Sequence, residues 1–353
     1  MDRPTHSFPI FRGRLRTAAV GLRGLTGRIR WRHDAPESAP RSPRPRRWIR
    51  WPDALFATLV GGAGALVLAL ALSITAILVY ESELSFRTFG FGYLWTTTWN
   101  PNSNVYGIVP SVEGTLITSG LALLIAVPLA LGAAIFLTTQ APRWLRGPAA
   151  TVIELLAAVP SVIYGLWGLY VIHPYMSAVV EPKLQHYLGW TGLFGGTPVG
   201  LDILTASVIL AVMVVPTICA VSRETLAAVP VAQREAAMSL GATDWETTRV
   251  AVLPYARSGI VGGTILGLGR ALGETMAVTM LIGNSSRIPT SLLSQGQTIA
   301  SLIATTLTSN SGPLEESAVV EAGLVLLVIA IAVNAAARIL VWKVLRTGGG
   351  IVE

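Results

Sequence analysis

Two oppositely charged residues, Arg270 and Glu274, stand four positions apart inside a long apolar stretch of this 353-residue chain. In an α-helix that spacing puts two side chains on one face, one turn apart, where they can meet. The guanidinium of arginine offers paired N–H donors that match two oxygens of a phosphate-like oxyanion. A neighbouring carboxylate would balance the arginine when no anion is bound and would weaken retention of the anion. The pair predicts an anion pathway; the alternative is a packing role in which the charges only neutralise each other.

Other patterns that carry chemistry are missing from the sequence. The four histidines have no metal-ligand spacing, and the single cysteine, Cys219, cannot form an internal disulfide. Neither of the two lysines, Lys183 and Lys343, follows a glycine, so the phosphate-binding loop G-x-x-x-x-G-K-[ST] is absent. We therefore expect no metal, no cofactor, no catalytic residue and no ATPase of that type in this chain.

The composition indicates a membrane protein. Hydrophobic residues make up 52% of the chain and charged residues only 13%, with a mean hydropathy of +0.59, whereas soluble proteins carry roughly 25% charged residues. Two stretches of 27 residues, 54–80 and 114–140, contain no charged residue and no histidine, and roughly 20 helical residues cross a bilayer. We predict an all-α polytopic protein with six membrane spans, at about 54–80, 115–138, 149–173, 204–222, 258–284 and 318–342.

The distribution of basic residues predicts the orientation, because Lys and Arg favour the cytoplasmic side of a membrane. With the N-terminus inside, the inner segments hold 22 of the 26 basic residues and the outer loops only 3. Both termini are therefore predicted to be cytoplasmic; a cell (inner) membrane location is implied by the family resemblance described below. Thirteen arginines against four acidic residues lie in residues 1–53, so the positive charge belongs to a tail and no nucleic-acid partner is expected.

Three regions are expected along the chain. Residues 1–50 are rich in Arg and Pro and predict a disordered basic cytoplasmic tail. That tail either attracts anionic membrane lipid or serves only as a topology anchor. Residues 51–346 form the transmembrane domain, and 347–353 a short cytoplasmic end.

The predicted fifth span, 258–284, is rich in glycine. The pairs Gly263/Gly267 and Gly269/Gly273 follow the G-x-x-x-G spacing that lets helices approach closely, so we expect this helix to be central in the bundle. Near the predicted outer end of the span, Thr275 and Asn284 could donate hydrogen bonds to an anion or contact other helices. Elsewhere, Glu154 in the third span either pairs with a basic residue or reaches the membrane surface by itself. The aromatic residues of the 81–113 loop predict a membrane-interface position, with an extracytoplasmic docking surface as the alternative.

The segment 231–254 between the predicted fourth and fifth spans is predicted to form two short helices joined by a glycine corner, which we call the elbow. The run 231–240 consists of good helix formers, and Gly241 follows where a left-handed cap favours glycine. Thr243 and Glu246 fit a capping box that opens a second helix. That helix is expected to run to about Leu253 and to stop at Pro254.

The spacing within the elbow is more specific than its shape. Glu235, Ala236, Ala237, Gly241, Leu253 and Pro254 resemble the E-A-A-x-x-x-G-x(9)-I-x-L-P coupling motif of ABC importer permeases, with Ala251 at the position of the isoleucine. The resemblance implies a type I ABC importer permease bundle. It also implies that these six residues contact a separate ATP-hydrolysing subunit. An ordinary amphipathic loop helix is the alternative.

The fifth span carries a second resemblance. Its segment 266–278, LGLGRALGETMAV, is similar to the fifth span of the phosphate-specific importer permeases of PstC type, and the likeness extends over roughly residues 54–345. It implies import of inorganic phosphate by alternating access, with Arg270 and Glu274 at the charged positions of phosphate passage. The implied partners are a PstA-type second permease subunit in a heterodimer, a cytoplasmic ATPase dimer and an extracytoplasmic phosphate-binding protein.

Three alternatives remain open from the residues themselves. The charged pair alone does not separate phosphate from sulfate or molybdate. An ion-gradient-driven secondary transporter or channel would not need the elbow. A structural scaffold would tolerate changes at Arg270.

Overall fold

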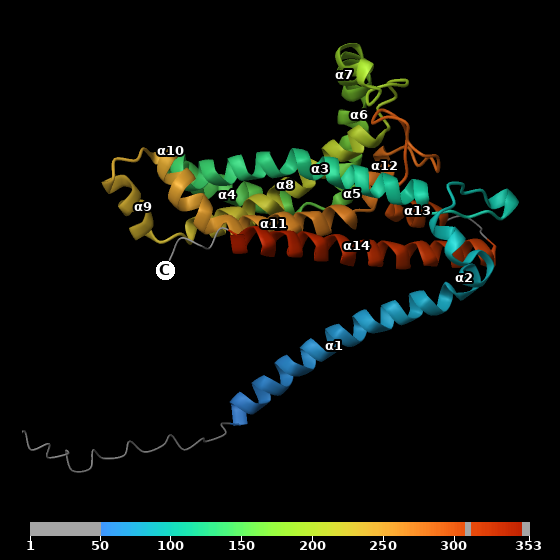
Figure 1. Ribbon diagram of the computed structural model, residues 1–353, viewed down its shortest axis with the longest axis horizontal. Helices are drawn as coiled ribbons and strands as arrows, with labels where there is room; N and C mark the ends of the chain where they lie inside the picture. Colours follow the sequence, from blue (N-terminus) through green and yellow to red (C-terminus); the bar gives the residue numbers. More distant parts are fainter. Residues whose placement is uncertain (1–50, 308–311, 348–353) are drawn as a thin grey trace, which may run out of the picture. The chain divides into compact units, whose positions relative to one another are not determined.

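The computed structural model describes residues 51–307 and 312–347. The predicted basic tail, and all but the first residue of the predicted C-terminal segment, lie outside the described residues. Ala63–Glu353 form one compact unit, and the arrangement given below is that of its described part (Figure 1). The helices are, in chain order, α1 (Trp51–Glu81), α2 (Glu83–Phe89), α3 (Val109–Ile135), α4 (Arg143–Ala158), α5 (Ser161–Trp167), α6 (His173–Tyr175), α7 (Glu181–Leu188), α8 (Ile203–Ala227), α9 (Val231–Ser239), α10 (Asp244–Thr247), α11 (Leu253–Leu272), α12 (Met276–Leu281), α13 (Ile299–Thr306) and α14 (Pro313–Thr347).

Six helical segments of the described residues are long and apolar enough to cross a membrane, which is the predicted number. Wider π-helical turns join several of the helices into these longer segments, for example α5, α6 and α7, and α10 and α11. The spans are Asp53–Glu81, Val109–Gln140, Ser161–Thr191, Ile203–Ala227, Asp244–Leu272 and Pro313–Ile339.

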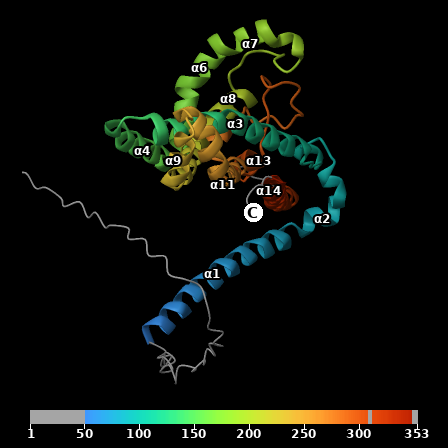
Figure 2. The same ribbon diagram turned by 60° about the vertical axis from the view of Figure 1, so that its left-hand side comes forward.

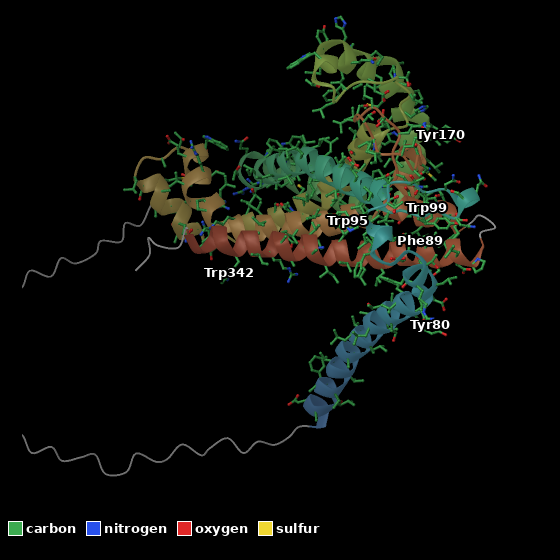
Figure 3. The ribbon with its side chains drawn as sticks, turned by 45° about the vertical axis from the view of Figure 1, so that its right-hand side comes forward. Tyr80, Phe89, Trp95, Trp99, Tyr170 and Trp342 are labelled. Carbon is green, nitrogen blue, oxygen red and sulfur yellow. The ribbon has the colours of Figure 1, made fainter. Side chains whose placement is uncertain are left out.

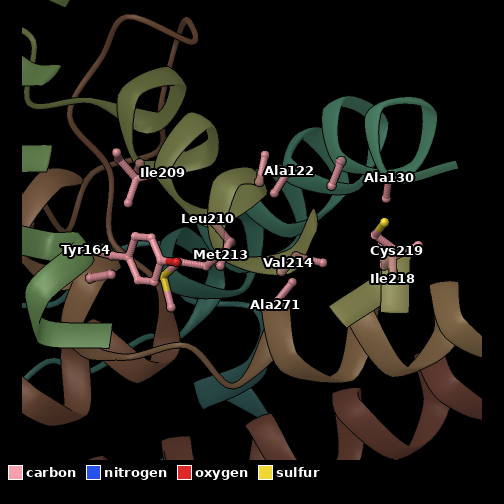
Figure 4. Packing of buried hydrophobic residues seen from close by; sticks show 14 of the residues in the cluster. Ala122, Ala130, Tyr164, Ile209, Leu210, Met213, Val214, Ile218, Cys219 and Ala271 are labelled. Atoms are coloured by element: carbon pink, nitrogen blue, oxygen red, sulfur yellow. The ribbon is translucent and has the colours of Figure 1, made fainter. Parts of the chain in front are cut away.

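Helix α8, and not the glycine-rich fifth span as we expected, forms the centre of the bundle, and α3 and α11 run along it (Figures 1 and 2). Buried side chains account for 72% of its most apolar window, against 28% or less in the other spans. Helix α3 turns a stripe of alanines spaced four apart toward α8, and Figure 4 shows the packing along this seam. Small residues at a helix contact let two backbones approach closely. The buried stripe consists of Ala122, Ala126, Ala130 and Ala134.

Glycines bring α11 close to α8. A methyl group on Gly267 would come within 2.7 Å of Ile218 and 2.9 Å of Val214, and one on Gly263 within 3.1 Å of Val221. The predicted close-packing role of this glycine pair is therefore confirmed. The second predicted pair is different, because a methyl group on Gly269 would meet only Asn334, at 3.9 Å, and Gly273 lies where the helix ends.

The predicted third span, 149–173, is wrong in its bounds. The chain breaks at Val159 and Pro160, both with extended backbone, so that α4 is a separate helix and the span begins at Ser161. A proline disfavours the helical conformation of the residue before it and cannot donate to the preceding turn. The sequence signal was present at Pro160, but its effect is a break between two helices.

The predicted fifth span, 258–284, also differs at both ends. The helix does not stop before Pro254: α10 runs through a π-helical turn, Thr248–Val252, into α11. In that wide turn the N–H of Leu253 bonds to the carbonyl of Thr248, and such a turn can accommodate the missing N–H of the proline that follows. At the far end α11 terminates at Leu272, and α12 begins after a three-residue interruption.

At the end of the bundle away from α9, the loop of residues 90–108 folds on itself (Figure 3). Tyr93 and Tyr106 are buried, and the Tyr106 ring packs edge-on against Phe89 and Trp99. These aromatics therefore form a small core, which corrects the expectation that they all lie at the membrane interface. Trp95, with 80% of its surface exposed, is free to take that role.

The close contact between α11 and α8 predicts that alanine substitutions at two glycines of α11 will differ in their effect on stability. Gly267→Ala should lower stability by about 1–3 kcal/mol, because its methyl group would press on Ile218 and Val214. Gly262→Ala is the matched control: nothing lies within 4 Å of its methyl position. The thermal unfolding midpoint of the purified protein in detergent measures both. Equal midpoints for the two variants would contradict the close contact.

Candidate substrate pathway and coupling elbow

Arg270 lies in the last turn of α11, at the break in the fifth span. The C-terminal carbonyls of a helix carry a partial negative charge, which stabilises a cation there. Its side chain is half-buried, and its Nε atom is buried without a hydrogen-bond partner among the described residues. An arginine with an unused donor inside a membrane domain is able to bind an anion.

Glu274 lies on the other side of the break. Its Oε1 atom accepts a hydrogen bond of 3.3 Å from the backbone N–H of Ala277, in the first turn of α12. Within the described residues no ion pair joins Glu274 to Arg270. The expected geometry of one continuous helix, with the two charges a turn apart, is therefore corrected: Gly273 ends α11 between them.

The two uncharged candidates also belong to this interruption. Thr275 is the residue before α12, and its hydroxyl donates to the carbonyl of Gly273 at 3.3 Å. Asn284 takes a left-handed backbone, and its amide Nδ2 donates to the carbonyl of Thr279 at 2.8 Å. Each side chain is thus engaged near one end of α12. Discontinuous membrane helices of this kind expose backbone ends to a substrate in many transporters.

A cavity of about 630 Å³ opens beside Arg270, on the α11 and α14 side of α8. It brings together polar residues that the sequence analysis did not connect with Arg270. Asn334 and Arg338 stand four apart in the last span, the same spacing that drew attention to Arg270 and Glu274, so a signal was available. The lining consists of Thr217, Gly262, Ile265, Leu266, Gly269, Arg270, Asn334 and Arg338.

The predicted elbow corner is confirmed. Gly241 follows α9 with a φ of +86°, a conformation that is strained for residues with a side chain. Thr243 and Glu246 form the predicted capping box: the Thr243 N–H donates to Glu246 at 2.8 Å, and the Thr243 hydroxyl accepts from the Glu246 N–H.

The predicted coupling residues divide between two places. Glu235 and Ala236 are exposed on α9, Ala237 is half-buried, and Gly241 is exposed at the corner. Leu253 and Pro254 instead lie in the first turn of α11.

Two exposed apolar residues of the elbow, Leu240 and Trp245, were missed. Their side chains have 89% and 56% of their surface exposed. Both apolar side chains are therefore accessible for contact with another protein.

Two arginines fix this end of the bundle. Arg234 of α9 donates from Nη2 to the carbonyl of Leu226, near the C-terminus of α8, at 2.8 Å. Arg223 of α8 bonds to Glu154 of α4 at 2.7 Å. Glu154 thus pairs with a basic residue, the first of its two predicted alternatives.

Six spans, an exposed helical corner and an arginine at a helix break are the features of a transport subunit, and sequence comparison agrees. Residues 126–346 match the profile of the binding-protein-dependent transport system inner membrane component family. The phosphate transport system permease protein PstC of Pasteurella multocida is 46% identical over 287 residues, covering 80% of this chain and 89% of that protein. The PstC protein of Mesorhizobium japonicum is 44% identical, covering 84% and 92%.

The chain therefore belongs to the binding-protein-dependent transport inner membrane components, as a relative of the PstC-type permeases. Among solved structures, a bacterial ABC transporter involved in the import of the acidic polysaccharide alginate aligns with a TM-score of 0.57 at 18% identity. The alignment covers 83% of this chain and 98% of that chain. At that identity the likeness concerns the fold, which is the predicted all-helical ABC importer permease bundle.

The left-handed corner predicts a local effect of one substitution. Gly241→Ala should loosen the elbow, because a left-handed conformation costs residues with a side chain about 1–2 kcal/mol. Hydrogen–deuterium exchange of peptides from residues 231–252 should become faster, while exchange in α8 stays unchanged. Gly147→Ala is the control, since Gly147 lies in α4 without a positive φ and without a neighbour within 4 Å. Unchanged exchange in Gly241→Ala would contradict the strained corner.

Proposed function

We propose that this chain is a permease subunit of an ABC importer that carries inorganic phosphate into the cell. The observation that carries the proposal is Arg270, placed at a helix break with an unpartnered buried Nε and facing a cavity. Its guanidinium suits a tetrahedral oxyanion. The PstC relatives, named as phosphate permeases and matching most of the chain, support phosphate as that anion.

The helix that bears Arg270 also supplies a mechanical link. Asp244–Leu272 is a single helical segment of 29 residues, so at roughly 1.5 Å per residue it is about 40 Å long. One end forms the second half of the elbow, and the other end carries the arginine. Motion of the elbow would therefore be transmitted to Arg270 along one continuous helical segment, as alternating access requires.

The partners and the orientation follow as part of the same proposal. The elbow residues Glu235, Ala236 and Leu240 would dock on a separate ATPase dimer, which hydrolyses the ATP. A PstA-type permease would complete the membrane pathway, and an extracytoplasmic binding protein would deliver phosphate to the opposite end. The elbow and both termini would then face the cytoplasm, in agreement with the bias of basic residues toward that side.

Phosphate uptake tests the role of Arg270. In cells whose phosphate import depends on this transporter, Arg270→Gln should lower labelled phosphate uptake at least about thirtyfold, as expected when a charged partner of a bound ion is removed. Arg270→Lys, which keeps the charge but loses the paired donors, should be intermediate. Arg143→Gln, at an exposed residue of α4, is the matched control and should transport normally.

The same assay identifies the anion. Excess unlabelled phosphate should compete with the label, whereas sulfate and molybdate should not. Uptake that persists in Arg270→Gln at normal complex levels would show that the arginine is structural. If sulfate or molybdate competed as strongly as phosphate, the transporter would not be specific for phosphate, and the proposed substrate would be wrong.

ATPase docking is tested at the exposed elbow. Leu240→Asp should reduce the amount of ATPase that co-purifies with the permease at least about tenfold, because a buried charge would replace an apolar contact. The membrane domain should remain folded, since Leu240 is 89% exposed within this chain. Trp190→Asp, at a similarly exposed residue outside the elbow, is the control. Full co-purification of the ATPase with Leu240→Asp would place the docking surface elsewhere.

A further inference from the structure

Two arginines line the cavity beside α11, and no acidic residue of the described chain shares its lining. Arg270 comes from the end of α11 and Arg338 from α14. Arg270 is half-buried and Arg338 is exposed, so the cavity carries two positive charges at its lining, and like charges repel each other. Glu274, the acid nearest in sequence to Arg270, is not part of the lining and contacts the first turn of α12. The cavity therefore favours an anionic occupant that compensates both guanidiniums.

The uncharged residues of the cavity suit an oxyanion as well. Thr217 contributes a hydroxyl from α8 and Asn334 an amide from α14. The amide presently donates to the carbonyl of Ala330, one turn earlier in its own helix, at 2.8 Å. Both groups can donate hydrogen bonds to phosphate oxygens. The remaining lining, Gly262, Ile265, Leu266 and Gly269, offers no competing charge.

Along the bundle axis, the cavity residues lie in an order that leads from Arg270 toward the elbow. Helices α11 and α14 contact each other and run in opposite directions (Figure 1). Asn334 lies beside Gly269, next to Arg270. Arg338 follows Asn334 by four residues and lies about 6 Å further toward the elbow end. An anion released from Arg270 toward the elbow would meet Arg338 next.

We propose that Arg338 is a second anion-binding residue of the pathway and that it forms, with Arg270, Asn334 and Thr217, a release site for the phosphate dianion. The inference rests on the proposed phosphate import. An anion that is bound by two arginines in turn is held less tightly by each of them, which allows the bound anion to leave. The alternative is that Arg338 only anchors the end of α14 at the membrane surface.

A protection experiment tests anion binding in this cavity directly. Leu266 lines the cavity and is 56% exposed, so Leu266→Cys provides a reporter in the whole transporter, purified in lipid nanodiscs. The native Cys219 is buried, and the unsubstituted chain measures its background labelling by N-ethylmaleimide. Millimolar phosphate should slow labelling of Leu266→Cys at least about threefold relative to chloride at equal ionic strength.

Second substitutions assign that protection to Arg338. Adding Arg338→Gln should abolish the protection, Arg338→Lys should keep part of it, and Arg143→Gln should leave it intact. Protection that survives Arg338→Gln, or no protection in Leu266→Cys itself, would overturn the release site.

Transport provides the second readout, which does not depend on labelling. Arg338→Gln should lower phosphate uptake at least about tenfold at normal levels of assembled transporter, with partial recovery in Arg338→Lys. Normal uptake in Arg338→Gln would show a surface anchor and overturn the inference, while leaving the proposed import of phosphate intact if Arg270→Gln is inactive. Absence of phosphate uptake in the unsubstituted transporter would instead overturn the proposed function.

Discussion

The close contact between α11 and α8 is the constraint on which the candidate pathway depends. Gly263 and Gly267 leave room for Val214, Ile218 and Val221, so the two helices meet at backbone distance. Arg270 follows Gly267 by one turn, and Thr217 precedes Ile218 by one residue. The same contact therefore places the arginine and the hydroxyl at one cavity. A bulkier residue in the seam would push α11 away and separate the groups that are proposed to handle the anion.

Much of the fold could be predicted because its signals are local. Long apolar stretches gave the number of spans, and the capping box and left-handed glycine gave the elbow, because each depends on a few neighbouring residues. Proline and glycine were harder to interpret, because their effect depends on surrounding structure. Pro254 follows a π-helical turn that accommodates it, Pro160 separates two helices, and Gly273 ends α11 rather than packing against a neighbour.

The candidate site was predictable only in part, because its residues come from distant positions. Arg270 stood out as a charge inside an apolar stretch, but its local partner in the sequence, Glu274, lies beyond a helix end. The residues that share the cavity, Thr217, Asn334 and Arg338, come from two other helices. Their proximity follows from the packing of α11 against α8 and α14, which no spacing within a single segment expresses.

The π-helical turn between α10 and α11 has a consequence for how the elbow is aimed. Such a turn amounts to one extra residue in an otherwise regular helix, and each residue advances the side chains by roughly 100° around the axis, at 3.6 residues per turn. The extra residue therefore determines the angle around the helix axis between the Trp245 side chain and the membrane-embedded face of α11. A chain with one residue more or one fewer in this turn would present the same elbow side chains rotated around the helix axis, while its membrane domain stayed unchanged.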